Sequence, residues 1–195
     1  MSEKRVATKK RETYETKVEV TIDLDGDGNA NIDSGIKFFN HMLNQLAKHS
    51  GFDLTINAEG DLEIDEHHTV EDIGITLGDA FLSALGDKKG IKRFANNLAP
   101  LDETLVRTAL DISGRPYLFT DLNLTREMVG DFPSELTEEF LKSFVNHAKV
   151  TLHVDLLRGE NCHHQIEAVF KSLALALKES TEVVSDKMPS TKGML

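Results

Sequence analysis

Two pairs of adjacent histidines are the residues of this chain best suited to chemistry. His67-His68 and His163-His164 lie 96 positions apart, and each pair is followed by a glutamate, Glu71 in the first case and Glu167 in the second. Residues three apart on a helix are neighbours, so an imidazole and a carboxylate at this spacing can bind one divalent cation. The repeated arrangement predicts a duplicated metal-binding unit.

Neighbouring histidines on a helix point in different directions, so both cannot easily reach one ion. We therefore expect each doublet to divide between two metals or between two subunits, which favours a site at an interface. Imidazole suits Mn, Fe, Co, Ni or Zn, and carboxylate ligands shift the preference toward a harder ion such as Mn²⁺.

Further candidate ligands lie outside the doublets. His41, in the segment Phe39-Asn40-His41-Met42-Leu43, is either a ligand or a histidine packed in the core. His49 is two turns further along the same helical face, so both could line one cavity. Superposing the two halves of the sequence places Glu139 at the position of His41. Glu139 is therefore a candidate ligand, with His153 as its rival.

Several cationic residues could bind a phosphate group. They are Arg93, Arg115 in Ser113-Gly114-Arg115-Pro116-Tyr117, and Lys192 in the loop Ser190-Thr191-Lys192-Gly193. An arginine fork and a lysine beside hydroxyl donors match the oxygens of a phosphate, although each charge taken singly could be merely solvated. Lys171 follows Glu167 by four positions, so it either contacts the same site or pairs with that glutamate.

The composition narrows the functional classes. The chain has 195 residues and a formal net charge of -11, which argues against nucleic acids and anionic membranes as partners. It has no apolar run long enough to span a bilayer, and its N-terminus lacks the apolar core of a signal peptide. The single cysteine, Cys162, excludes an internal disulfide framework. We expect a cytoplasmic protein.

Two charged segments are given structural interpretations. The Asp23-x-Asp25-x-Asp27-Gly28 segment imitates a calcium loop but lacks the glutamate at its twelfth position, so we interpret it as a hairpin turn.

The N-terminus is basic, and we expect a solvated arm or one that becomes ordered on assembly. Its cationic residues are Lys4, Arg5, Lys9, Lys10 and Arg11.

The hydrophobic pattern predicts an α+β fold made of two similar halves. Alternating residues predict strands and apolar stripes at helical spacing predict helices, with residues 14–24 and 30–33 forming a hairpin. Strands are predicted at 14–24, 30–33, 52–57, 61–65, 103–112, 116–124 and 149–156, and helices at 37–50, 68–85, 135–147 and 163–177. Each half is then β-β-α-β-β-α, with sheets covered by helices. We expect a single domain of two pseudo-repeats, about 12–90 and 100–180, followed by a polar tail.

Several motifs in order resemble those of the imidazoleglycerol-phosphate dehydratase family, over nearly the whole chain. They include Phe39-Asn40-His41-Met42-Leu43-x-Gln45-Leu46-x-x-His49 and His67-His68-Thr69-x-Glu71-Asp72. They also include Gly159-x-Asn161-x-His163-His164-x-x-Glu167-x-x-Phe170-Lys171 and Pro189-Ser190-Thr191-Lys192-Gly193. The resemblance implies a ribosomal protein S5 domain 2-like fold, a 24-subunit homo-oligomer with sites at subunit contacts, and two Mn²⁺ per site.

The resemblance also implies roles for particular residues. His41, His68, Glu71 and His163 would bind one metal, and His67, His164 and Glu167 the other. Many members have histidine where this chain has Glu139, so either Glu139 or His153 completes the second set. Glu15 matches a residue tied to substrate and proton transfer, with His49 or a metal-bound glutamate such as Glu71 as the alternative base. The residues expected to contact substrate are Glu15, His41, His49, His67, Arg93, Arg115, His163, Lys171, Ser190 and Lys192.

The implied reaction dehydrates D-erythro-1-(imidazol-4-yl)glycerol 3-phosphate to 3-(imidazol-4-yl)-2-oxopropyl phosphate in histidine biosynthesis. The hydrogen that is lost is not next to a carbonyl, so it is not acidic. Metals bound to both ring nitrogens would make the imidazole imidazolate-like, and the ring could then expel the hydroxyl group. The rival hypotheses are a non-catalytic metal-storage or metal-sensing protein and a metal-dependent phosphate hydrolase.

Overall fold

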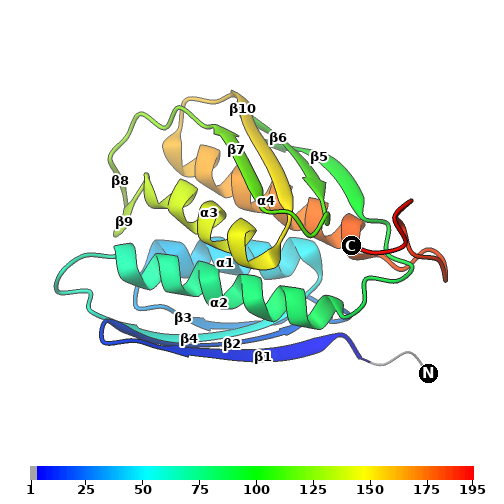
Figure 1. Cartoon of the computed structure of the whole chain (residues 1–195). Helices are drawn as coiled ribbons and strands as arrows, with labels where there is room; N and C mark the ends of the chain where they lie inside the picture. Colours follow the sequence, from blue (N-terminus) through cyan, green and yellow to red (C-terminus); the bar gives the residue numbers. More distant parts are fainter. Residues whose placement is uncertain (1–3) are drawn as a thin grey trace.

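The chain forms two four-stranded sheets that enclose two layers of helices (Figure 1). The structure is a computed structural model, and it describes residues 4–195. The first sheet lies against α1 and α2, and the second lies against α3 and α4, so that the helices of the two halves meet in the middle of the molecule.

The first half contains four strands and two helices. Its sheet has the order β1-β2-β4-β3, in which β3 and β4 are parallel and the other neighbours are antiparallel. Its elements are β1 (Val6–Glu12), β2 (Thr16–Asp23), β3 (Ala30–Asp33), α1 (Lys37–Ser50), β4 (Asp53–Gly60) and α2 (His67–Leu85).

The second half repeats this arrangement. Its sheet has the order β5-β6-β10-β7, again with the edge strand β7 parallel to its neighbour. Its elements are β5 (Phe94–Leu101), β6 (Thr104–Asp111), β7 (Tyr117–Asp121), a short ribbon of β8 (Met128–Val129) and β9 (Phe132–Pro133), α3 (Leu136–Ala148), β10 (Thr151–Arg158) and α4 (Cys162–Thr181).

The expected α+β class, with two similar halves and helix-covered sheets, is confirmed, but the strand pairing differs from the predicted hairpin. β2 and β3 do not pair, because β4 inserts between them and pairs with both. The acidic loop between β2 and β3 is therefore a crossover between non-adjacent strands. Asp25 in this loop pairs with Arg5, which directly precedes the neighbouring strand β1.

The prediction of a solvated basic arm at the N-terminus is wrong for the residues that the structure describes. Val6–Glu12 is the edge strand β1, paired with β2 along its whole length. Its cations face acidic partners, as Lys10 does with Glu19 and Arg11 with Asp72. The acidic neighbours thus allow a strongly charged segment to join the sheet.

Two further strand assignments require correction. The strand predicted at residues 61–65 is a series of turns that leads into α2. The strand β5 was not predicted, because Asn96, Asn97 and Pro100 break its apolar alternation. In each half, the strand that the sequence analysis missed is the edge strand that comes first in sequence, β1 in the first half and β5 in the second.

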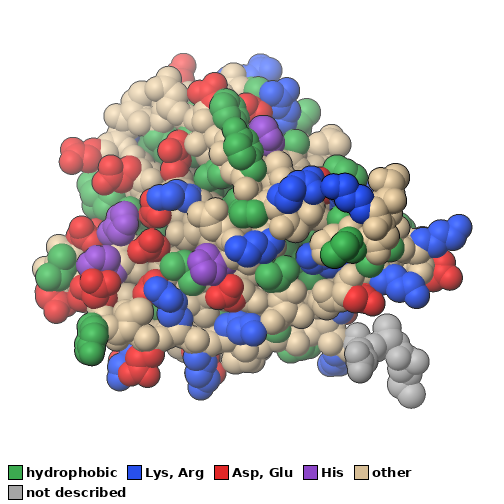
Figure 2. All heavy atoms as spheres, in the orientation of Figure 1, with side chains coloured by type: hydrophobic (Ala, Val, Ile, Leu, Met, Phe, Trp, Pro, Cys, Tyr) green, Lys and Arg blue, Asp and Glu red, His purple; other side chains and the backbone are tan. Residues whose placement is uncertain are grey.

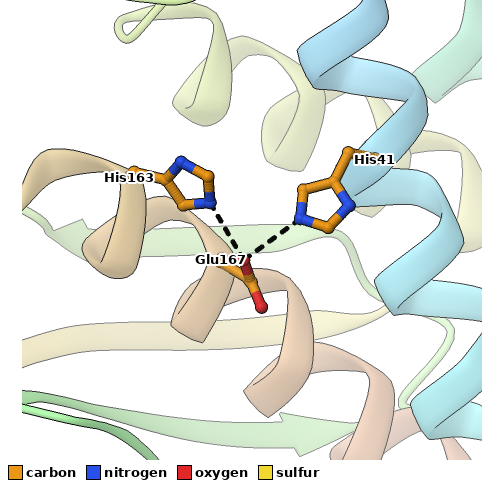
Figure 3. A group of neighbouring side chains, drawn as sticks. All are labelled: His41, His163 and Glu167. Atoms are coloured by element: carbon orange, nitrogen blue, oxygen red, sulfur yellow. Dashed lines mark hydrogen bonds and ion pairs between the residues drawn. The ribbon is translucent and has the colours of Figure 1, made fainter.

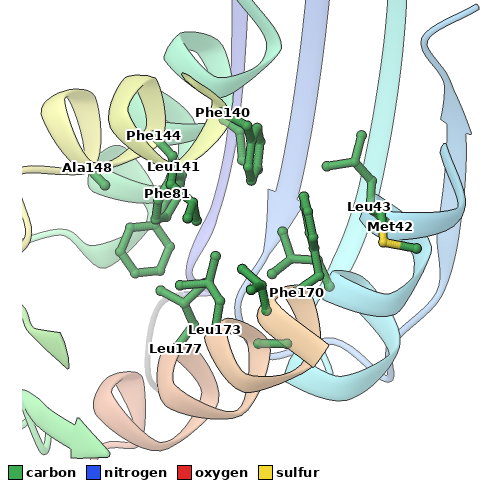
Figure 4. Close-up of a cluster of buried hydrophobic side chains, with 14 of the residues drawn as sticks. Met42, Leu43, Phe81, Phe140, Leu141, Phe144, Ala148, Phe170, Leu173 and Leu177 are labelled. Atoms are coloured by element: carbon green, nitrogen blue, oxygen red, sulfur yellow. The ribbon is translucent and has the colours of Figure 1, made fainter. Parts of the chain in front are cut away.

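Phenylalanine side chains fill the space between the helices (Figure 4). Phe39 of α1 packs edge-on against Phe140 of α3 and Phe170 of α4, with ring centroids 5.4 and 6.3 Å apart, respectively. Burying such rings is the main source of stability in a core of this kind. This core fixes the four helices and therefore the residues at their ends.

Glycines allow α2 and α3 to approach closely. A Cβ atom on Gly74 would lie 2.9 Å from the Cβ of Ser143, and one on Gly78 would lie 2.7 Å from the Cβ of His147. The contacts step by four residues on both helices, so the two helices run side by side in the same direction. None of the helices in the described part of the chain is long and apolar enough to cross a membrane.

Candidate functional site

The two histidine doublets open α2 and α4 at the same end of the molecule (Figure 1). The side chain two positions before each doublet accepts a hydrogen bond from the first backbone N–H of that doublet. The Asp65 carboxylate accepts from the backbone N–H of His67 at 2.8 Å, and the Asn161 amide oxygen accepts from that of His163 at 3.0 Å. Such bonds satisfy free N–H groups of the first turn. They hold both doublets in the first turn of their helices, at the first two positions of α2 and the second and third of α4.

Histidine and acidic side chains gather on the surface at this end, where α2 begins (Figure 2). The Phe38 ring packs edge-on against the His163 ring, with centroids 5.1 Å apart. The imidazole is therefore positioned from the side by an apolar neighbour while its nitrogens remain available.

His41, His163 and Glu167 form a compact group that joins the two halves of the chain (Figure 3). The Nε2 atoms of His41 and His163 lie 3.2 and 3.1 Å, respectively, from the same carboxylate oxygen of Glu167, Oε2. One potential ligand atom from each residue lies within 4.8 Å of the others. Within residues 4–195 this is the only group of three histidine, cysteine or acidic side chains that satisfies this criterion.

Glu167 is ionised despite its burial. Burial opposes the charge, but the Lys171 ammonium and the two imidazoles lower the pKa of this carboxyl to about 2. Lys171 donates to the second oxygen, Oε1, at 2.6 Å. Lys171 therefore pairs with Glu167, one of the two possibilities that the sequence left open. Two imidazoles and a carboxylate are ligands that suit Mn²⁺ and neighbouring first-row ions, so these residues fit a metal.

The second histidine of each doublet has a carboxylate on its Nδ1 atom. Asp61 lies 3.0 Å from Nδ1 of His68, and Glu103 lies 2.9 Å from Nδ1 of His164. Hydrogen bonds to these carboxylates raise the pKa of both histidines. A carboxylate on one ring nitrogen orients a metal-binding histidine and directs the other nitrogen to the metal. Both rings are thus arranged to use Nε2.

Glu15 lies over the first doublet. Its Oε1 atom is 3.8 Å from Nε2 of His68, and its backbone carbonyl accepts from the N–H of Asp61 at 3.1 Å. The side chain is about half exposed. Glu15 therefore reaches a predicted metal ligand from the turn between β1 and β2, with one side open to an incoming molecule.

Glu139 lies on α3, and its carboxylate contacts Lys142 and Ser143. The close contact of Ser143 with Gly74 implies that Glu139, one turn earlier, is level with Val70 on α2. Glu139 is thus beside the helix that carries His67 and Glu71. His41 lies beside α4 in a comparable way, but Glu139, unlike His41, contacts no other candidate ligand among the described residues.

The remaining histidine candidates occupy different environments. His49 contacts Gln45 at 3.1 Å, and burial together with the nearby positive charge of Lys171 lowers its pKa. It thus remains close to the His41 and Glu167 group. His153, in contrast, lies on the outer face of the second sheet between Tyr117 and Phe119, away from the helices. Within one chain Glu139 is therefore better placed than His153 to complete a metal site.

The predicted phosphate-binding residues gather near the C-terminus, at the other end of the molecule. Arg93 donates to the Asp111 carboxylate and, at 2.8 Å, to the backbone carbonyl of Pro189. It therefore anchors the segment that carries Ser190 and Lys192. The turn that contains Arg115 also approaches this segment, because a Cβ on Gly114 would lie 3.1 Å from the carbonyl carbon of Leu195.

One chain does not bring the metal and phosphate candidates together. The backbone N–H of Arg93 donates to the carbonyl of Ser180, near the end of α4, whereas Glu167 lies in its second turn. Thirteen residues at 1.5 Å each separate Glu167 from Ser180 by about 20 Å along the helix. His41, His163 and Glu167 are brought together, and His67, His68 and Glu71 form a separate set on α2.

The sequence did not predict the carboxylates that hold the doublets. Asp61 precedes His68 by 7 positions, whereas Glu103 precedes His164 by 61. The two therefore share no spacing that would reveal their common role. Asp65 and Asn161, which accept from the backbone N–H groups of the doublets, do share a spacing, two residues before each doublet, and this local signal could have identified them.

These features define a protein with histidine-carboxylate groups that fit a divalent metal at one end and phosphate-binding candidates at the other. Residues 34–177 match the family model described as imidazoleglycerol-phosphate dehydratase. The imidazoleglycerol-phosphate dehydratase of Hydrogenovibrio crunogenus is 52% identical over 194 residues, covering 98% of this chain and 100% of the relative. That of Pseudomonas paraeruginosa is 54% identical over 194 residues and covers 98% of both chains.

Solved structures of imidazoleglycerol-phosphate dehydratases are also similar to this chain. The crystal structure of the Staphylococcus aureus dehydratase has a TM-score of 0.82 and 42% identity, and covers 90% of this chain and 97% of its own. The Pyrococcus furiosus structure, in complex with (S)-C348, has a TM-score of 0.84 and 37% identity, and covers 96% and 100%, respectively. The chain belongs to the imidazoleglycerol-phosphate dehydratase family, whose members are hydro-lyases of histidine biosynthesis.

Proposed function

We propose that this protein dehydrates D-erythro-1-(imidazol-4-yl)glycerol 3-phosphate to 3-(imidazol-4-yl)-2-oxopropyl phosphate in a reaction that depends on Mn²⁺. The observation that carries the proposal is the convergence of His41 and His163 on the ionised Glu167 carboxylate. This group offers two imidazoles and one charge to a cation, which is the donor set expected for Mn²⁺ or a similar ion.

Two sets of residues would hold the metal ions. The first is His41, His163, His164 and Glu167, and the second is formed by the doublet on α2 with Glu71 and Glu139. This grouping places Glu167 with His41 and His163, whereas the resemblance implied that Glu167 shares an ion with His67 and His164. His68 and His164 would contribute through Nε2, since Asp61 and Glu103 occupy the Nδ1 side. When bound, two Mn²⁺ ions would supply Lewis acidity to the imidazole ring of the substrate.

The residues of this chain would then move the protons and fix the substrate. Glu15 takes the proton from the carbon next to the departing hydroxyl group, because its carboxylate lies beside His68 and is open on one side. The C–O bond breaks, the departing hydroxide combines with the proton that Glu15 has taken and leaves as water, and the resulting enol becomes the ketone. Arg115, Ser190 and Lys192 bind the phosphate and hold the carbon chain in place for elimination.

Such a site requires more than one protomer. A three-carbon chain separates imidazole from phosphate in the substrate, whereas about 20 Å separates Glu167 from the residues near the end of α4. We infer that the phosphate-binding end of one protomer completes the metal-binding end of another. This inference accounts for the presence of the metal-binding candidates at one end of the folded protomer and the phosphate-binding candidates at the other. It agrees with the expected 24-subunit homo-oligomer.

The outer face of the second sheet offers a surface for such an assembly. Four large apolar side chains on β5 and β7 are about half exposed there, namely Phe94, Leu98, Tyr117 and Phe119. The two pairs lie on the opposite edge strands of the sheet, with Ala109 of β6 and His153 of β10 between them. Exposed apolar side chains of this size on one face commonly mark protein interfaces. The outer face of the first sheet instead carries polar residues such as Lys17 and Glu59.

The direct test is incubation of the Mn²⁺-loaded protein with imidazole glycerol phosphate. We expect the ketone product, detected by its enolised form in alkali. Released inorganic phosphate would instead identify a phosphate hydrolase, and metal uptake without conversion of the substrate would identify a metal-storage protein. The positions of Glu15 and of the phosphate candidates favour the dehydratase, because storage uses neither.

A further inference from the structure

Asp72 is a buried carboxylate that connects α2 to the hairpin formed by β1 and β2. It is only 3% exposed. Its Oδ2 atom accepts from the hydroxyl of Thr16 at 2.5 Å, and its Oδ1 atom accepts from Nε of Arg11 at 2.6 Å. Thr16 itself is 3% exposed. Asp72 therefore holds one residue of each strand.

The two bonded residues lie on either side of the turn that carries Glu15. β1 ends at Glu12 and β2 begins at Thr16, so only three residues connect the strands. The turn is tight, because the Thr13 hydroxyl accepts from the backbone N–H groups of both Glu15 and Thr16. A shift of Arg11 or Thr16 would therefore move Glu15.

Asp72 and His68 lie one turn apart on α2, so they occupy the same face of the helix. Asp72 contacts the strands, and His68 contacts the turn between them through Glu15. The backbone N–H of Asp61, in the loop before α2, donates to the Glu15 carbonyl and so also holds the turn in place. The turn is thus fixed at both ends against the helix that carries the first doublet.

Packing alone does not account for a carboxylate at this position. Burying a charged group costs free energy unless it is fully paired, and an apolar side chain would pack α2 against the sheet at lower cost. A hydrogen-bonded carboxylate adds direction instead, because its two oxygens fix the positions of two specific donors.

We propose that Asp72, through Thr16 and Arg11, is a positioning residue that places the Glu15 carboxylate for proton transfer. This inference rests on the proposed function, in which Glu15 is the base. Asp72 does not touch the substrate, and it acts only by fixing the turn. Proton transfer demands accurate geometry, and a displacement of about 1 Å can reduce a rate about 100-fold.

The test compares Thr16→Val with Thr16→Ser in the Mn²⁺-loaded protein. Valine has nearly the shape of threonine but lacks the hydroxyl donor, whereas serine retains it. We expect Thr16→Val to lower kcat about 10-fold or more, with KM and Mn²⁺ affinity nearly unchanged. Thr16→Ser should recover most of the rate. Thr21→Val, which removes an exposed hydroxyl from the same strand, is the matched control and should leave kcat unchanged.

A double-mutant comparison separates positioning from general stability. In a Glu15→Gln background, measured with protein in excess over substrate, Thr16→Val should cause little further loss, because the group that it positions is already absent. An equal loss in both backgrounds, or an unchanged kcat in Thr16→Val, would overturn the inference.

Amide exchange of residues 13–16 gives a measurement that does not depend on the reaction. It should increase in Thr16→Val and Asp72→Asn but not in Thr21→Val, and unchanged exchange in the first two variants would also overturn the inference. If the wild-type protein failed to convert the substrate, the proposed function would fail, whereas this comparison would still test whether Asp72 fixes the turn.

Discussion

His41 and Glu167 come from different halves of the chain, and Nε2 of the histidine lies 3.2 Å from Oε2 of the glutamate. The contact joins α1 to α4, and the pairing of α2 with α3 places Glu139 in the equivalent position of the other half. The two halves of the chain thus place a histidine and a glutamate at corresponding positions, and only the group with His41 has its candidate ligands gathered within the described residues.

The carboxylates behind the doublets should control metal affinity. Asp61→Asn and Glu103→Gln keep the size of each side chain but remove the charge that orients His68 or His164. Loss of such a partner typically weakens metal binding about 10-fold to 100-fold. Calorimetric titration of the metal-free protein with Mn²⁺ measures this change. Glu63→Gln, a variant of an exposed residue near Asp61, serves as the control, and wild-type affinity in both Asp61→Asn and Glu103→Gln would refute the assigned role.

Removal of the proposed base should affect turnover more than binding. Glu15→Gln retains the shape of the side chain but cannot accept the proton, so we expect kcat to fall by a factor on the order of 10² to 10⁴ with little change in substrate affinity. Steady-state kinetics and a binding titration separate the two effects. Glu12→Gln, at the end of the neighbouring strand, is the control. Undiminished turnover would remove Glu15 from this role and leave His49 or Glu71 as candidates.

Complementation between subunits should reveal the shared site. Glu167→Gln damages the metal-binding end, and the double variant Arg115→Ala with Lys192→Ala damages the phosphate-binding end. Each variant alone should be nearly inactive. If their subunits are mixed equally and reassembled, about one site in four combines two intact ends, so about a quarter of the activity should return. A mixture no more active than the average of its parts would place the whole site within one chain.

Asp131 should stabilise the fold in a pH-dependent manner. Burial opposes its charge, but bonds from the backbone N–H groups of Phe38 and Lys37, at the start of α1, lower the pKa of its carboxyl. A lowered pKa gives stability that is present above the unfolded value of about 3.9 and is lost as the pH falls through the lower folded value. This cap helps to orient the helix that carries His41.

We expect Asp131→Asn to lower the free energy of unfolding by about 1 kcal/mol at neutral pH. The difference from wild type should shrink toward pH 3. Urea unfolding of the metal-free protein at both pH values measures this effect, with the exposed Asp121→Asn as the control. A difference that stayed constant across this range would show that the charge of Asp131 does not contribute.

Local patterns in the sequence were sufficient for much of the fold. Helical spacing of apolar residues identified α1, α2, α3 and α4, because each helix buries one face against a sheet or another helix. The strand β1 could not be recognised in this way, because its charges are balanced only after folding, that of Lys10 by Glu19 on the paired strand and that of Arg11 by Asp72, 61 positions further along the chain. Strand order also depends on contacts between distant segments, so the predicted pairing of β2 with β3 was wrong.

The sequence indicated the candidate metal ligands, but not the residues that position them. The types and spacing of the doublet residues indicated metal binding, and the duplication identified Glu139 as a counterpart of His41. The roles of Asp61, Glu103 and Asp72 depend on contacts that only folding creates. Asp72 ends the motif that begins with the first doublet, but its bonds to Thr16 and Arg11 cannot be read from that motif. The separation between Glu167 and the phosphate candidates also became apparent only when α4 was seen to extend between them.

The most direct test of the account is the metal dependence of the dehydration. The protein would be stripped of metal by a chelator and incubated with imidazole glycerol phosphate, while Mn²⁺ is added stepwise and product is measured. The account predicts no turnover without metal and recovery that is complete at about two Mn²⁺ per chain, in keeping with two half-sites. Full activity in the rigorously metal-free protein would contradict it.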